Sequence, residues 1–333
     1  LAVEPLPGPA LAPRPPRYNA MSALRQIAQR LAAASDLKLL LDDALAALEE
    51  HMGVRHAMVL LAEICPQRPP RLYTVATHGY ADSGVGSEIP YGQGVIGVAA
   101  AQATPIRISH FAAEYSYSRA MRDQWLASGA ADAPEIEIPL PGLAEPQSQL
   151  AVPIVLGRRV VGVLYVESEE AGCFSYDDED ALMAVATHLG ATIAALQTAA
   201  EAPEDSRVAA PPAVAPRAAA SPSPADAAPA VVRRYRINDS VFIDDDYLIK
   251  GVAGAIFWKL VNDVVAGRRD EFTNRELRLD PTLKLPDIAD NLEARLILLQ
   301  RRLAERCPFI AIEKTGRGRF RLRVDRPLRA VDA

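Results

Sequence analysis

The residues with the most evident chemistry are arginines near the end of the chain. In the segment EKTGRGRFRLRV, residues 313–324, every second position from 317 to 323 is arginine. A guanidinium that neutralises a DNA phosphate releases counterions and contributes sequence-independent affinity. The same alternation is typical of a strand with one buried face. We expect a hairpin tip at Gly316–Gly318 with Arg317 at its apex. The other arginines then share one strand face: Arg319, Arg321 and Arg323.

A second candidate surface lies on the helix predicted just before this hairpin, within NLEARLILLQRRL at residues 291–303. Leucines at spacings of four, three and four residues predict its buried stripe. The other side chains lie nearer the open side: Asn291, Glu293, Arg295, Leu298, Arg301 and Arg302. Asparagine reads adenine edges and arginine reads guanine, so Asn291 and Arg295 are the candidate base contacts. Arg301 and Arg302 are the candidate phosphate contacts.

No other residues form a set with catalytic or metal-binding spacing. The cysteines, Cys65, Cys173 and Cys307, lie far apart without a CxxC pair, and the histidines form no HExxH motif. These spacings favour neither a disulfide framework nor a metal site, and they fit a reducing cytoplasm. Because a nucleophile–base pair and a phosphate loop are also missing from the sequence, we do not expect an enzyme.

Charge is divided unevenly along the 333 residues. From Val231 onward there are 21 basic and 16 acidic residues, a net +5, so the rest of the chain, whose total is −6, carries −11. This split allows a nucleic-acid partner for the C-terminal part. No apolar run approaches the roughly 18 to 20 residues that cross a bilayer, so we expect no membrane contact.

Composition also predicts two domains. Residues 200–231 are rich in alanine, proline and serine and predict a flexible linker. Residues 1–19 form a similar linker-like stretch, which leaves room for a further domain upstream of Leu1. The first domain is therefore expected at residues 20–199 and the second at residues 232–329.

The first domain has helix signals at both ends and strand signals between them. Residues 37–52 predict a helix with Asp36 as its N-cap and Gly53 as its stop. Apolar strand-like runs follow, and an amphipathic helix begins after Ser175. This order predicts an α+β fold with an antiparallel sheet. The apolar stripe of the last helix is either core or a dimer seam.

Three segments of this domain resemble the GAF domain: IPYGQGVIGVAAAQATPIRI, SQLAVPIVLGRRVVGVLYVES and CFSYDDEDALMAVATHLGATIAAL. The resemblance implies a small-molecule pocket on one face of the sheet and dimerisation through the first and last helices. The patterns of cyclic-nucleotide-binding and bilin-binding members are missing from the sequence, so the ligand or cofactor stays unknown. The variable middle implies the ligand-binding candidates: Tyr91, Tyr115, Tyr117, Arg119, Arg122 and Trp125. An exposed aromatic loop is the alternative interpretation of these residues.

The second domain reads as short strands, three helices and a terminal hairpin, with Thr273 as a helix cap. In GRRDEFTNREL, NLEARLILLQRRL and EKTGRGRFRL it resembles the winged helix-turn-helix of OmpR/PhoB-type response regulators. The resemblance implies that the long helix enters the DNA major groove and that the hairpin contacts the minor groove or backbone. Ile297-Leu298 stands where that family commonly has two basic residues, so docking of a protein through Leu298 is the open alternative.

Together these features predict a ligand-responsive transcription regulator, in which a GAF sensor controls a winged-helix DNA-binding module. The expected partners are double-stranded DNA, an unidentified small molecule and a second copy of the chain in a homodimer. The expected compartment is the cytoplasm. The alternative is a non-DNA-binding signalling or interaction protein whose winged helix docks a protein partner.

Overall fold

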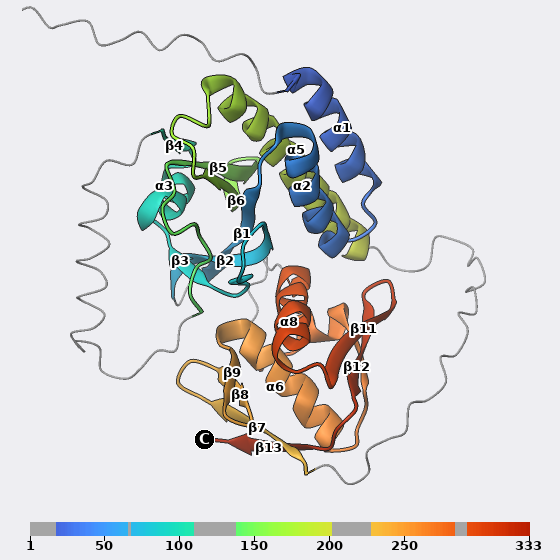
Figure 1. Ribbon diagram of the computed structural model, residues 1–333. Helices are drawn as coiled ribbons and strands as arrows, with labels where there is room; N and C mark the ends of the chain where they lie inside the picture. The colour runs from blue at the N-terminus through green and yellow to red at the C-terminus, as the bar shows by residue number, and fades with distance from the viewer. Residues whose placement is uncertain (1–17, 66–67, 110–137, 202–227, 284–291) are drawn as a thin grey trace, which may run out of the picture.

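The computed structural model describes residues 18–65, 68–109, 138–201, 228–283 and 292–333, which form two α+β units (Figure 1). The N-terminal unit comprises α1 (Ala20–Ala33), α2 (Leu37–Met52), β1 (His56–Cys65), β2 (Arg68–His78), β3 (Glu88–Pro90), α3 (Gly94–Gln102), β4 (Ile106–Ile108), β5 (Ser148–Leu156), β6 (Arg159–Ser168) and α5 (Tyr176–Glu201). The C-terminal unit comprises β7 (Ala230–Tyr235), β8 (Ser240–Ile243), β9 (Asp246–Ile249), α6 (Gly251–Val265), β10 (Glu271–Thr273), α7 (Asn274–Leu279), α8 (Leu292–Arg306), β11 (Ile310–Gly316), β12 (Arg319–Val324) and β13 (Leu328–Asp332).

One antiparallel sheet organises the N-terminal unit, with the strand order β3-β2-β1-β6-β5-β4. Helices α1, α2 and α5 cover one face, and α3 lies on the other (Figure 1). Alternation along β1 supplies both apolar layers, because Val59 and Leu61 face the three helices while Met58 and Leu60 face α3. The predicted α+β fold with an antiparallel sheet is confirmed for this unit.

Local signals fix both ends of α2 and the start of α5, as the sequence predicts. The Asp36 carboxylate accepts a hydrogen bond from the Leu39 amide at 2.9 Å, and Gly53 ends α2 with a φ of 70°. At the start of α5, the Ser175 amide donates to the Asp178 carboxylate at 2.8 Å, and the Asp178 amide donates back to the Ser175 hydroxyl at 3.2 Å. This reciprocal pair satisfies two backbone donors that the helix itself leaves open.

The apolar stripe of α5 is core within this single chain. Its residues pack with α1 and α2 on the sheet: Leu182, Val185, Leu189 and Ile193, with Leu196 partly buried beside them. Among the described residues, the α5 segment Tyr176–Ala199 is also the one helix whose length and composition would suffice to cross a membrane, and 39% of its most apolar window is buried. Helix α3 was not predicted, because Gly94–Gln102 is apolar around its whole circumference and shows no helical periodicity.

Two small sheets frame the helices of the C-terminal unit. Their strand orders are β13-β7-β8-β9 and β10-β12-β11. An apolar core with Phe257, Phe272 and Phe320 joins α6, α7 and α8 to both sheets. Thr273 caps α7, since its hydroxyl accepts from the Glu276 amide at 3.2 Å. Strands β10 and β13 were not predicted, and β13 extends the unit to Asp332 by pairing in parallel with β7.

The terminal hairpin has the geometry that its alternation predicts. Gly316 pairs with Arg319, so Arg317 and Gly318 form a two-residue turn, and Gly318 adopts a φ of 61°. Phe320 and Leu322 are buried, whereas the arginines of β12 face outward or lie half-buried. Two of these arginines are paired within the unit. Arg321 contacts Glu271 at 2.5 Å, and Arg323 contacts Glu313 at 2.7 Å.

Candidate functional site

Helix α8 lies between the two units, with the sheet of the N-terminal unit on one side and α6 on the other (Figure 1). The predicted leucine stripe packs into the core of the C-terminal unit: Leu292, Leu296, Leu299 and Leu303. The prediction that the opposite side of α8 is open is wrong, because α2 and β2 of the N-terminal unit cover it.

Apolar side chains from each unit enter the core of the other. Ala294 and Ile297 of α8 are 4% and 6% exposed and join the apolar cluster of the N-terminal unit. In the reverse direction, Val85 of the loop before β3 joins the core of the C-terminal unit. At Gly86 an added Cβ would lie 3.5 Å from Cδ1 of Leu298. Ile297 and Leu298, the apolar pair that stood out in the sequence, therefore lie at the seam between the units.

A nearly buried ion pair crosses this seam. Arg295 donates to the Glu63 carboxylate of β1 at 2.8 Å, and their side chains are only 12% and 11% exposed. The other Glu63 oxygen accepts from the Tyr73 hydroxyl at 2.5 Å. Burial, together with the charges of Glu63 and Glu88, raises the pKa of Tyr73, so the phenol stays a neutral donor. Arg295, Glu63 and Tyr73 thus form one hydrogen-bonded chain that crosses the interface.

Arg301 makes the second cross-unit contact, about two turns further along α8. One guanidinium nitrogen donates to the Val75 carbonyl of β2 at 2.7 Å, and another donates to the Asp42 carboxylate of α2 at 2.5 Å. The Arg301 side chain is 14% exposed, whereas that of Asp42 is 47% exposed. This contact therefore lies at the rim of the interface.

Three further polar contacts cross the interface. Lys250 lies 3.6 Å from Glu88, and Lys314 lies 3.7 Å from Asp36. The Ser83 hydroxyl donates to Glu305 at 2.5 Å. In every cross-unit ion pair of the described residues, the base comes from the C-terminal unit and the acid from the N-terminal unit. The charge split of the sequence is thus expressed as electrostatic complementarity between the two units.

The remaining predicted α8 residues have different surroundings. Arg302 is 4% exposed and donates to the Leu248 carbonyl at 3.1 Å and to Glu305 at 3.2 Å. Burial lowers the pKa of Arg302, and its contacts hold α8 against β9 inside the C-terminal unit. Glu293 is half-buried, and Asn291 lies outside the described residues. Arg302 was therefore wrongly placed on an open side.

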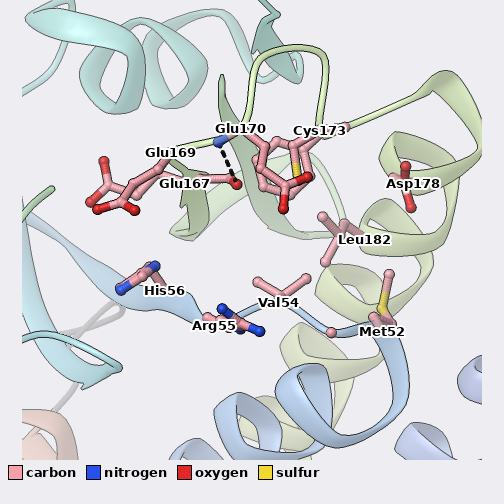
Figure 2. Close-up of a pocket in the computed structure, with 13 residues that line it drawn as sticks. Met52, Val54, Arg55, His56, Glu167, Glu169, Glu170, Cys173, Asp178 and Leu182 are labelled. Atoms are coloured by element: carbon pink, nitrogen blue, oxygen red, sulfur yellow. Dashed lines mark hydrogen bonds between the residues drawn. The ribbon is translucent and has the colours of Figure 1, made fainter. Parts of the chain in front are cut away.

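A separate cavity of about 320 Å³ opens at one end of the N-terminal sheet (Figure 2). Its walls come from the α2–β1 turn, the end of β6 and the start of α5. Figure 2 shows the carboxylates of Glu167, Glu169 and Glu170 on one side, opposite Arg55 and His56. Met52, Val54 and Leu182 also line the cavity, so its wall combines apolar side chains with charged ones of both signs.

Glu167 is the most constrained acid of this cavity. It is 3% exposed, and its two oxygens accept from the Leu143 amide at 2.7 Å and the Tyr165 hydroxyl at 2.9 Å. Burial and the neighbouring Glu167 charge raise the pKa of Tyr80, whose ring lies 5.5 Å from that of His56. With a donor on each oxygen, the Glu167 carboxylate is held in place by the protein itself.

The predicted ligand-binding residues do not converge on this cavity within the described chain. Tyr91 packs with the apolar cluster between the sheet and α3, on the other face of the sheet, where burial raises its pKa. The other candidates lie outside the described residues: Tyr115, Tyr117, Arg119, Arg122 and Trp125. Across the described ranges, no group of three or more histidine, cysteine or acidic side chains could hold a metal ion.

The architecture defines an α+β domain, with three helices on one face of a six-stranded antiparallel sheet and α3 on the other. Residues 36–193 match the GAF domain family model, and the chain therefore contains a GAF domain at these positions. No curated protein matches the chain.

Several solved structures are similar to this region. The GAF domain of an Acinetobacter phosphoenolpyruvate-protein phosphotransferase is 22% identical, with 54% of this chain and 94% of that one covered and a TM-score of 0.42. The free methionine-R-sulfoxide reductase of Neisseria meningitidis, in complex with its substrate, is 22% identical, with 54% and 91% covered and a TM-score of 0.40. The nlh2 GAF domain of A. aeolicus in an inactive state is 16% identical, with 53% and 96% covered and a TM-score of 0.37.

Sequence reasoning missed the acidic half of the interface, which consists of Asp36, Asp42, Glu63 and Glu88. Two signals pointed toward it. The N-terminal part carried the excess negative charge, and Ile297-Leu298 stood between Arg295 and Arg301 where two basic residues were expected. Neither signal specifies which acids meet which bases, because the partners are more than 150 residues apart in sequence.

Proposed function

We propose that the chain is a ligand-responsive transcription regulator, in which the GAF domain controls DNA binding by the C-terminal unit. The GAF domain indicates a sensor or signalling role. The observation that supports a DNA-binding output is the terminal hairpin, which projects exposed Arg317 at its tip beside a three-helix unit. A basic hairpin next to a helix is the arrangement that winged-helix proteins use on duplex DNA.

Binding of a labelled duplex from the protein's own promoter, measured by fluorescence anisotropy over a salt series, tests this proposal. We expect binding at low salt that weakens steeply as salt rises, because phosphate contacts release counterions. The series includes Asp42→Arg, which removes the acid that holds Arg301. Failure of both wild type and Asp42→Arg to bind at low salt would overturn the DNA-binding function.

A second candidate function is protein docking without DNA binding. It is favoured by the burial of Ile297 and Leu298 at the seam between the units, which makes α8 a protein-binding helix in this structure. This alternative expects no salt-sensitive DNA binding even from Asp42→Arg. The same titration therefore separates the two candidates.

The sensor function calls for a ligand in the GAF domain, and we further propose that the regulator acts as a homodimer. Native mass spectrometry of the purified chain measures both properties at once. We expect a mass of two chains together with a small-molecule adduct. A monomer without an adduct would argue against both.

A further inference from the structure

We infer that the acidic surface of the GAF domain that carries Asp42 and Glu63 is an inhibitory docking site for α8, so that docking and DNA binding exclude each other. The closed arrangement described here would be the inhibited one. The DNA part of this inference rests on the proposed function, whereas the docking part does not.

The docking site satisfies the same donors that DNA would, namely the predicted base contact Arg295 and the predicted phosphate contact Arg301. Arg295 and Arg301 place their guanidinium groups on the carboxylates of Glu63 and Asp42 at 2.8 and 2.5 Å. Arg301 also gives a donor to the Val75 carbonyl at 2.7 Å. Charge-assisted bonds of this kind are those that arginine makes to carboxylate and phosphate alike. Either partner can take these two arginines, but both partners cannot take them together.

The space that DNA needs around α8 is a second reason why docking and DNA binding exclude each other. A major groove about 12 Å wide admits an exposed helix, and it cannot admit one that is packed on both sides. Ala294 and Ile297 are buried in the core of the GAF domain, so α8 must leave that domain completely before DNA can approach this face. Docking is consequently a two-state equilibrium whose closed state conceals the competent surface.

The cavity and the docking site share two elements. The cavity is walled by the turn Met52–His56, which joins the end of α2 to the start of β1. Asp42 lies on α2, and Glu63 lies on β1. A ligand that prefers a different placement of α2 relative to β1 would therefore alter the spacing of the two acids and bias the docking equilibrium.

The test combines scattering with DNA titration on the full chain. Asp42→Arg, at an exposed position of α2, places a second cation next to Arg301. Glu63→Arg places a second cation next to Arg295. Glu145→Arg is the matched control, because Glu145 is exposed, belongs to the same unit and undergoes the same charge change. Small-angle X-ray scattering reports closure independently of DNA. The reciprocal pair Asp42→Arg with Arg301→Asp tests whether closure returns.

We expect a larger radius of gyration for Asp42→Arg and Glu63→Arg, and wild-type values for Glu145→Arg and the reciprocal pair. Apparent DNA affinity should rise at least about tenfold in the two opened variants, since the competent fraction limits binding. Unchanged radii in both variants would overturn the docking inference. Larger radii with wild-type DNA affinity would show that docking is not inhibitory. Larger radii without DNA binding by any form would overturn the proposed DNA function together with the inhibition, and would leave the docking confirmed.

Discussion

Shortening Ile297 to alanine should loosen the contact between α8 and the GAF domain. Ile297 belongs to a helix of the C-terminal unit, yet its side chain is 6% exposed within the core of the GAF domain. Truncating a buried isoleucine to alanine costs about 2 to 5 kcal/mol. Because an interface can relax more readily than a closed core, we expect the lower end, about 2 kcal/mol. That value corresponds to about a 30-fold larger open population.

Hydrogen–deuterium exchange of the intact protein measures this change at a site remote in sequence from the substitution. The reporter is residues 83–88 of the GAF domain, where the Gly86 amide donates to the Thr74 carbonyl at 2.9 Å and Val85 enters the C-terminal core. If these amides exchange through domain opening, Ile297→Ala should accelerate them by up to about 30-fold.

A matched substitution separates docking from damage to the helix itself. Arg306 is exposed at the end of the same helix, so Arg306→Ala should leave exchange at residues 83–88 unchanged. Faster exchange confined to α8 in Ile297→Ala, with residues 83–88 at wild-type rates, would refute the reasoning. It would mean that Ile297 stabilises only its own unit.

Three further outcomes follow from individual residues. Arg317→Ala and Arg319→Ala should each lower the salt slope of DNA binding by about one and weaken all sequences alike, as salt titrations on duplexes of different sequence would show. Burial raises the pKa of the Cys307 thiol to about 11, so the thiol stays neutral at pH 8. Its alkylation by iodoacetamide, followed by mass spectrometry, should be slow there and accelerate only as pH rises toward 11. Gly254→Ala should lower the free energy of unfolding of the C-terminal unit by about 1 to 3 kcal/mol, because the new Cβ would lie 2.0 Å from the Asp239 carbonyl oxygen. The change would be measured as a lower melting temperature. A gain in stability, which is the usual result of Gly→Ala inside a helix, would contradict the packing described.

Features set by neighbouring residues could be predicted from the sequence. The ends of α2 follow from Asp36 and Gly53, because a cap and a left-handed stop act within a few residues. The hairpin of β11 and β12 follows for the same reason, since its turn and its alternation are both local. Strand β13 could not be found in this way. Its parallel pairing with β7 joins residues about one hundred positions apart, and nothing in its own five residues demands that partner.

At the candidate site, too, features set by neighbouring residues could be predicted, whereas contacts between residues distant in sequence could not. The leucine spacing of α8 correctly identified its buried stripe, but it could not show whether the opposite side was covered. That side of α8 faces the GAF domain. The sequence of α8 carries no spacing pattern that would show whether another domain covers that side. Ile297-Leu298 indicated a protein contact as the alternative to DNA, but this pair did not identify the acids involved.

The most direct test of the central claim, that the C-terminal unit docks on the GAF domain with α8 between them, is zero-length carbodiimide cross-linking of the unmodified protein. This reagent joins a lysine to a carboxylate only when the two are in contact. We expect cross-linked peptides that join Lys250 to Glu88 and Lys314 to Asp36, which lie 3.6 and 3.7 Å apart across the interface. Lys259 and Asp280, 3.2 Å apart within the C-terminal unit, provide the internal positive control. Recovery of the Lys259–Asp280 product without either cross-unit product would contradict the account.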